Sequence, residues 1–145
     1  MDRIELEPSV GQTLPVADNR PLVPEPLPVR LVTVDDATLP ASAGLEVQID
    51  WFYCGLLKFD REQGHPLIYH ADNFRLLFEI VERFPERDSL RPLVVEVPRL
   101  SEIELGLIER KIEYTRLRGI TPGEERLAVQ DPAGNWLEIV EFRMI

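Results

Sequence analysis

Apolar and polar positions follow two similar patterns, one in each half of the chain. In the first half, β-branched residues favour a strand at VRLVTV, and Leu45, Ile49 and Phe52 recur at helical spacing. Two further apolar runs, separated by the turn residues Ala71 to Asn73, favour a pair of strands. The first half is therefore predicted to contain a strand, a helix and two strands, over residues 29–34, 45–59, 66–70 and 74–82.

The second half repeats this order. Ser101 and Glu104 have the spacing of a capping box, and Leu100 and Leu105 have that of a hydrophobic staple, so a helix is predicted to begin here. Gly119 is predicted to end it in a left-handed conformation. The turn DPAGN predicts a hairpin between the last two strands. The second half is therefore predicted to contain a strand, a helix and two strands, over residues 93–97, 101–118, 126–130 and 136–142.

Prolines are concentrated at the beginning of the chain, where the segment RPLVPEPLP has a proline at every second or third position. Because proline fixes its own φ and removes a backbone donor, residues 1–28 are predicted to form an extended arm or linker before a domain over 29–145. The composition permits a disordered tail. It also permits an arm that crosses to a partner subunit, because Leu22, Val23 and Leu27 would give such an arm apolar surface to bury.

Composition and charge exclude several classes of protein. The chain has 145 residues, 44% of them hydrophobic, which suits one globular domain with a buried core. A formal net charge of -10 argues against nucleic acid and anionic membranes as partners, because both attract basic surfaces. No apolar run approaches the roughly 18 residues that span a bilayer. The single Cys54 excludes an internal disulfide and suits a reducing compartment, so we expect a cytoplasmic protein.

Two segments carry a resemblance to a known family. The helix end WFYCGLLKF is similar to the FY-x-x-x-LGF segment of the glyoxalase, bleomycin-resistance and extradiol dioxygenase superfamily, also called vicinal oxygen chelate proteins. The closing segment DPAGNWLEIVEF resembles the DP-x-GN-x-x-E segment of the same superfamily. The resemblance covers residues 29–142 and leaves the proline-rich arm unexplained.

The resemblance implies a fold and an assembly. The fold would be α+β, with duplicated β-α-β-β-β modules over residues 29–84 and 91–145 that form a curved mixed sheet with an inner cleft. Modules of this family pair within one chain or across a dimer. We expect a homodimer in which the N-terminal arm contacts the partner.

The resemblance also implies where a metal would bind. In the family, each module donates a His or Gln from its first strand and a Glu from its last strand. The last-strand positions are Glu79 and Glu138, but the first-strand positions fall on Val29 or Arg30 and on Pro92 or Leu93, which supply neither imidazole nor amide. Half of the ligand set is therefore missing, and no catalytic transition metal is expected. The alternative is a divalent metal held by Glu79 and Glu138.

The expected cleft would be acidic with an apolar lining. Glu138 shares a strand face with Trp136 and Val140, where partial burial would make it a general base or a ligand anchor; the alternative is a structural glutamate in a salt bridge. Glu79 has Arg75 close by for a surface ion pair. The nearest bases by the alignment are Arg30, Arg75 and Arg91. The candidate ligand-binding residues are Glu138, Glu79, Glu96, Trp136, Val94 and Tyr69, with Phe74 or Phe78 as further apolar lining.

The remaining reactive side chains suggest no other chemistry. His65 and His70 are five residues apart in a predicted strand, so they point to opposite faces and cannot chelate one ion. Cys54 lies among apolar residues, where an inert buried thiol is expected. The sequence has no serine-protease-like triad, nucleophile elbow or glycine-rich phosphate loop.

Three functions remain open from the sequence. The first is binding of a small apolar or cationic molecule in an acidic cleft without a catalytic transition metal. The second is a metal-dependent lyase, isomerase or dioxygenase that uses Glu79 and Glu138 as ligands. The third is a degenerate module that serves only oligomerisation or regulation.

Overall fold

The computed structural model describes residues 27–84, 91–119 and 123–142. The arm predicted over residues 1–28 lies outside the described residues except for Leu27 and Pro28. At this end, the backbone N–H of Leu27 donates a hydrogen bond to Asp72 Oδ1 at 3.2 Å. Within the described ranges, no helix is both long enough and apolar enough to cross a membrane.

The first half of the chain forms one sheet with one helical segment. Its strand order is β2-β5-β4-β3, in which β2 runs parallel to β5 and the other pairs are antiparallel. The helical segment begins as an α-helix and continues as a π-helix, so the helix predicted over 45–59 is confirmed with an earlier end. The elements are β2 (Ala37–Ala41), α1 (Glu46–Asp50), η1 (Trp51–Leu56), β3 (Asp60–Arg61), β4 (Ile68–His70) and β5 (Arg75–Ile80).

The second half forms the other sheet. Its strand order is β1-β6-β9-β8-β7, in which β6 runs parallel to β9 and the other pairs are antiparallel. The strands predicted over 93–97, 126–130 and 136–142 are confirmed to within one residue at each end. The elements are β1 (Arg30–Leu31), β6 (Leu93–Val97), α2 (Leu100–Glu109), β7 (Tyr114–Arg118), β8 (Glu125–Gln130) and β9 (Trp136–Glu141).

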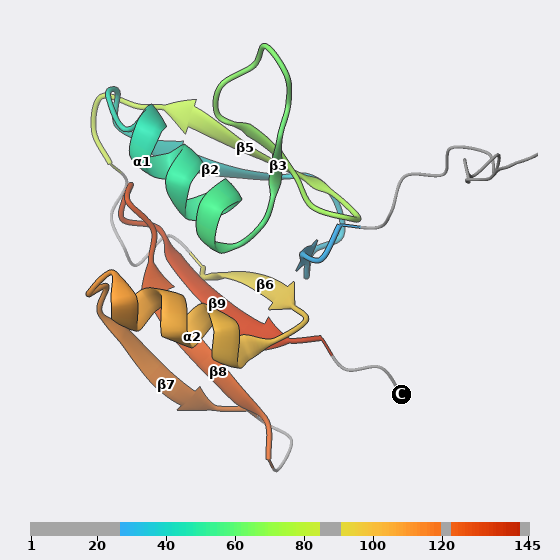
Figure 1. Cartoon of the computed structure of the whole chain (residues 1–145). Helices are drawn as coiled ribbons and strands as arrows, with labels where there is room; N and C mark the ends of the chain where they lie inside the picture. The colour runs from blue at the N-terminus through green and yellow to red at the C-terminus, as the bar shows by residue number, and fades with distance from the viewer. Residues whose placement is uncertain (1–26, 85–90, 120–122, 143–145) are drawn as a thin grey trace, which may run out of the picture.

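Both helical segments lie on the same side of the molecule, in front of their sheets in Figure 1. Among the described residues, each sheet therefore has one face covered by a helix and one face without a helix, called the open face below. The repeated order of a strand, a helix and three strands confirms the α+β fold with two β-α-β-β-β modules. Hydrogen bonding divides the described strands between two sheets.

The first strand of the first module is not where the sequence predicts it. Of the strand predicted over 29–34, only Arg30 and Leu31 form β1, and they pair antiparallel with β6 in the second sheet. The first strand of the first sheet is β2, in a segment predicted as a loop. The β-branched residues did identify a strand, but composition does not specify which sheet a strand joins. Pro40 favours a loop in the sequence, yet it is tolerated in β2 because this strand lies at the edge of its sheet.

The helix predicted over 101–118 is also wrong in its second part, which is the strand β7. After α2, Lys111 has a φ of 58°, a left-handed conformation that redirects the chain. The N-cap of α2 is Arg99, no side chain caps it, and Leu105 is exposed, so neither the capping box nor the staple forms. Gly119 does not end a helix, because its N–H donates to the carbonyl oxygen of Glu124 at 2.8 Å in the β7–β8 hairpin.

Large side chains fill the space between each sheet and its helix. In the first half, the ring of Tyr53 in η1 contacts those of Phe59, Tyr69 and Phe78, with centroids 5.5, 5.7 and 5.3 Å away. Such edge-on and stacked rings stabilise the core beyond the burial of their area. In the second half, alternate residues of β8 and β9 are buried on one face, namely Leu127, Val129, Leu137 and Ile139.

The two helical segments approach each other closely at Gly106 of α2. A Cβ atom at this position would lie 2.5 Å from Cδ1 of Leu56 in η1, which is far inside van der Waals contact. The absence of a side chain at residue 106 therefore lets the two halves pack without displacing Leu56.

Candidate functional site

The open face of the second sheet carries most of the residues that the sequence predicts for the cleft. Strand residues alternate between faces, and the register places Val94 opposite Glu138 and Glu96 opposite Val140. Trp136 and Glu138 therefore share this face, while Leu137 and Ile139 are buried on the face towards α2. The open-face residues on the four adjoining strands include Val94, Glu96, Thr115, Arg126, Ala128, Gln130, Trp136 and Glu138.

Glu138 is held in a salt bridge on this face. Nη1 of Arg126, on the neighbouring strand β8, lies 2.9 Å from Glu138 Oε1, and the two side chains are 27% and 26% exposed. Of the two interpretations open from the sequence, this geometry corresponds to the structural, salt-bridged glutamate. Arg126 thus occupies one of the two carboxylate oxygens of Glu138, Oε1.

Glu96 also has a guanidinium beside it. Nε of Arg30 lies 3.7 Å from Glu96 Oε1, and Nη1 of the same arginine lies 3.8 Å from Asp72 Oδ2. Arg30 therefore links the second sheet to the turn that precedes β5. Arg30 thus lies between the carboxylates of Glu96 and Asp72.

Glu79 lies on the first sheet, away from this arrangement. It is exposed on β5 opposite Pro40, and its side chain makes no hydrogen bond or ion pair with residues 27–84, 91–119 or 123–142. The ion pair predicted between Glu79 and Arg75 does not form, because Arg75 Nη2 contacts Asp36 Oδ2 at 3.1 Å instead. The backbone N–H of Arg75 also donates to Asp36, which lowers the pKa of that carboxyl group.

The donor set does not fit the metal site that the family resemblance implies. The first-strand residue beside Glu138 is Val94, and the one beside Glu79 is Pro40, so neither carboxylate has a nitrogen or oxygen ligand next to it. Across residues 27–84, 91–119 and 123–142, no three His, Cys, Asp or Glu side chains lie close enough to share a metal ion. We therefore derive no chemical step through a metal.

Tyr69, predicted to line the cleft, and Phe78, predicted there as an alternative to Phe74, lie in the core instead. Tyr69 is fully buried on the helix-covered face, where its hydroxyl donates a hydrogen bond to Asp50 Oδ1. Burial raises the pKa of this hydroxyl well above its usual value. Phe78 is buried against Tyr53 and Tyr69. Both predictions were wrong because the face of a strand depends on a register that the sequence leaves open by one residue.

The histidines and the cysteine contribute no site. His70 Nε2 lies 2.9 Å from Glu62 Oε1, and His65 is exposed before β4 begins, so the two histidines do not share a strand. Burial raises the pKa of the Cys54 thiol, which disfavours the reactive thiolate.

A pocket that the sequence did not reveal lies beside Trp136 on the open face. It has a volume of about 400 Å³, and Trp136 is 39% exposed at its wall. The sequence predicts a helix over residues 112–115, so it does not indicate that they lie next to β8. The strand-favouring pair Tyr114 and Thr115 is the sequence signal that could have indicated a strand here. The lining residues are Ile112, Glu113, Tyr114, Thr115, Ala128, Gln130 and Trp136.

The two segments that carry the family resemblance meet in a buried cluster, the buried junction, formed by Tyr53, Asp131, Asn135 and Pro40. The Tyr53 hydroxyl donates to Asp131 Oδ2 at 2.7 Å, and Asn135 Nδ2 donates to the carbonyl oxygen of Pro40 at 2.9 Å. Asp131 Oδ1 also accepts the backbone N–H of Ala133 and of Asn135. Burial raises the pKa of the Tyr53 hydroxyl strongly, and the negative charge of the neighbouring Asp131 raises it further. In this chain, these motif residues therefore join the two halves.

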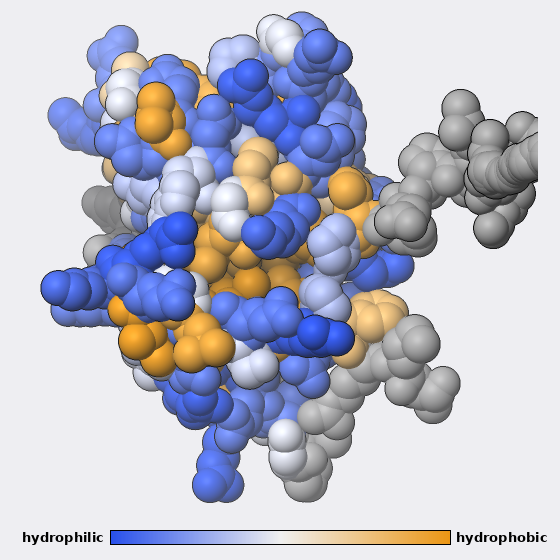
Figure 2. All heavy atoms as spheres, viewed as in Figure 1, coloured by the Kyte–Doolittle hydropathy of each residue, from blue (hydrophilic) through white to orange (hydrophobic). Residues whose placement is uncertain are grey.

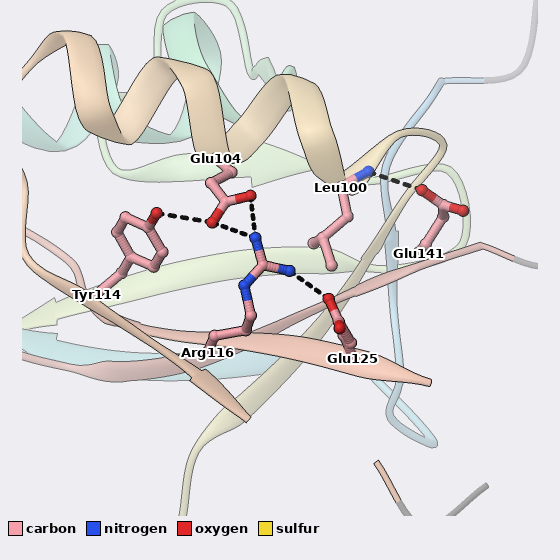
Figure 3. A network of polar contacts seen from close by, with 6 residues as sticks. All are labelled: Leu100, Glu104, Tyr114, Arg116, Glu125 and Glu141. Carbon is pink, nitrogen blue, oxygen red and sulfur yellow. Dashed lines mark hydrogen bonds and ion pairs between the residues drawn. The ribbon is translucent and has the colours of Figure 1, made fainter. Parts of the chain in front are cut away.

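A second polar cluster, the surface network, lies between α2 and the strands β7 and β8 (Figure 3). Glu104 accepts a hydrogen bond from the Tyr114 hydroxyl at 2.7 Å and pairs with Arg116, which also pairs with Glu125. The hydrogen bond from Tyr114, reinforced by Arg116, lowers the pKa of Glu104. Each charged side chain of the cluster has a partner within it, so we assign the surface network a structural role.

Comparisons with solved structures identify the fold. A glyoxalase family protein from Bacillus anthracis is 21% identical, with a TM-score of 0.63 over 77% of this chain and 95% of that one. A lactoylglutathione lyase from Agrobacterium tumefaciens is 15% identical, with a TM-score of 0.54 over 76% and 93%. An antibiotic-binding protein from a Streptomyces species is 21% identical, with a TM-score of 0.56 over 77% and 96%.

No protein-family model and no curated protein sequence matches the chain. At these identities, the structural likeness establishes the fold alone. The chain therefore has a glyoxalase-like fold, as the resemblance of the two sequence segments implied.

Proposed function

We propose that this protein binds a small apolar or cationic molecule on the open face of its second sheet, in the pocket beside Trp136, without a catalytic transition metal. The observation that carries the proposal is the composition of that pocket. Glu113 is the only charged residue among those that line it, and the rest of the lining is apolar, aromatic or neutral and polar. A volume of about 400 Å³ is within the range of small-molecule sites.

The side chains suggest how such a ligand would be held. The exposed indole ring of Trp136 can stack on an apolar ring or attract a cation to its face. Gln130 and Thr115 can accept or donate hydrogen bonds from the adjoining strands. Glu113 would attract a positive charge, whereas the nearby Glu138 already pairs with Arg126.

The structural neighbours support this class of function. One protein of the same fold is described as antibiotic-binding, so the fold is compatible with retention of a small molecule. A metal-dependent reaction, the alternative from the sequence, lacks comparable support because the donor set beside Glu79 and Glu138 does not fit.

The test is a titration with proflavine, a planar aromatic cation, followed by fluorescence polarisation. We expect saturable binding to the wild-type protein, an affinity loss of about tenfold in Trp136→Ala because a stacking face is removed, and a smaller loss in Glu113→Gln. Trp51→Phe is the matched control, since Trp51 is the other tryptophan and lies outside this pocket. Equal affinity in wild type and Trp136→Ala would refute the proposed site, and loss of binding on addition of EDTA would refute metal independence.

A further inference from the structure

A larger pocket lies on the opposite, helix-covered side of the molecule, between the end of η1 and α2. Its volume is about 580 Å³. Figure 2 shows it as a hollow with a hydrophobic floor surrounded by hydrophilic residues, between the two helical segments. Both halves of the chain contribute apolar lining residues, which are Pro28, Leu56, Leu57, Val97, Pro98 and Ile103.

The rim of this pocket is basic although the protein is acidic. Lys58, Arg99 and Arg110 line it, and the only acid among the lining residues is Glu102. Arg99 Nη1 neutralises Glu102 at 3.1 Å, which leaves Lys58 and Arg110 without an acidic partner in the pocket. In a chain with a formal net charge of -10, this local excess of positive charge would attract an anionic group.

Contacts within the protein hold Lys58 and Arg110 at the rim. The Arg110 guanidinium lies 4.7 Å from the centroid of the Trp51 ring, and Lys58 Nζ donates to the carbonyl oxygen of Gly55 at 3.0 Å. Because lysine has three donors and arginine has five, both retain N–H groups for a ligand. Gly55 and Gly106 also line the pocket and add no side chain to fill it.

From this arrangement we infer a second small-molecule site, which takes an amphiphile with an apolar body and one anionic group such as a carboxylate or sulfonate. The apolar body would lie on Leu56, Leu57 and Ile103, and the anion would accept hydrogen bonds from Lys58 and Arg110. This site differs from the proposed one in both its position and the charge of its ligand. It therefore stands or fails independently of binding beside Trp136.

The experiment compares two fluorescent probes of the same shape. Anilinonaphthalene sulfonate carries an anion, and N-phenylnaphthylamine is the neutral equivalent. We expect Lys58→Gln with Arg110→Gln to lower the affinity of the full chain for the sulfonate roughly tenfold, since charge-assisted hydrogen bonds are lost. The neutral probe should change less than about twofold. Arg91→Gln is the matched control, because Arg91 is exposed and lines neither this pocket nor the one beside Trp136.

A second measurement needs no substitution. In the wild-type protein, the sulfonate should shift the backbone amide NMR signals of Gly55 and Gly106 and leave those of Thr115 and Gln130 unchanged. The inference is overturned if the probe does not saturate, if the double variant binds it as well as the control, or if the shifted signals are those beside Trp136. Proflavine binding should not respond to the double variant.

Discussion

The buried junction and the surface network contain similar chemical groups in different surroundings. Each has a tyrosine hydroxyl that donates to a carboxylate at 2.7 Å, Tyr53 to Asp131 and Tyr114 to Glu104. The first pair is buried and joins the two halves of the chain, whereas the second lies at the surface of one half. Solvent can replace the partner of a surface group but not that of a buried one. The same bond should therefore have unequal effects on stability.

The largest effect is expected from removing the acceptor of the buried junction. Asp131→Ala leaves the Tyr53 hydroxyl and the backbone N–H groups of Ala133 and Asn135 without their acceptor. We expect a loss of about 3 kcal/mol in the free energy of unfolding, because several buried donors become unsatisfied. Urea denaturation measures it, and Glu104→Ala is the control in the surface network. A loss under about 1 kcal/mol would contradict the role of Asp131 in joining the halves.

The second largest effect is expected when the tyrosine of each cluster is replaced by phenylalanine, in two separate variants. Tyr53→Phe removes one donor to Asp131 Oδ2, but Asn135 Nδ2 remains at 3.1 Å, so we expect a loss of about 1 to 2 kcal/mol. Tyr114→Phe removes the same kind of bond at the surface and should cost less. Thermal unfolding of the two variants gives the comparison directly. If Tyr114→Phe were the more destabilising variant, burial would not be the deciding factor.

The two clusters should also respond to acid in opposite directions. Burial raises the pKa of Asp131 above its ordinary value of 3.8, so protonation of this carboxyl group stabilises the folded state. This stabilisation is fully present below pH 3.8 and is lost as the pH rises through the folded pKa. The Tyr114 hydrogen bond lowers the pKa of Glu104 below its ordinary value of 4.5, so its contribution is full above pH 4.5 and is lost as the pH falls through the folded pKa.

The measurement is the free energy of unfolding of wild type, Asp131→Asn and Glu104→Gln across the acid range. As the pH rises, the difference in the free energy of unfolding between wild type and Asp131→Asn should shrink. The corresponding difference between wild type and Glu104→Gln should grow. Curves that run in the same direction would mean that one of the two pKa directions is wrong.

The smallest effect is expected for Arg116→Gln. Arg116 pairs with Glu104 and Glu125 in an exposed position, where water and salt screen the attraction. We expect a shift in the melting temperature that is small in dilute buffer and disappears at about 1 M sodium chloride, where the Debye length is short. A salt-independent shift would indicate that the aliphatic part of the side chain, rather than its charge, stabilises the protein.

Features that depend on a local sequence pattern could be predicted, whereas features that depend on contacts between distant residues could not. The strands over 93–97, 126–130 and 136–142 were predictable because their apolar pattern is regular and the turn DPAGN separates the last two. The strand β7 was not, because residues 101–118 continue a helical spacing and only the left-handed Lys111 interrupts it. The bond between Tyr53 and Asp131 joins residues 78 positions apart, so no local pattern could indicate it.

The candidate site was predictable in part. Trp136, Glu138 and Val94 do share the open face, because strand alternation fixes faces once the register is known. Glu79 lies on the other sheet, and Tyr69 is buried in the core. The register of β7, β8 and β9 determines that Arg126 pairs with Glu138. The same register forms the pocket beside Trp136. That alignment is a tertiary property.

The position of Pro40 also bears on how copies of the chain meet in concentrated solution. The edge strand β2 could act as a template for a strand of another molecule, the usual first step of edge-to-edge aggregation. At Pro40, however, the edge offers no N–H group, and its carbonyl oxygen already accepts a hydrogen bond from Asn135. The contact that joins the two halves thus also protects this exposed edge from strand addition.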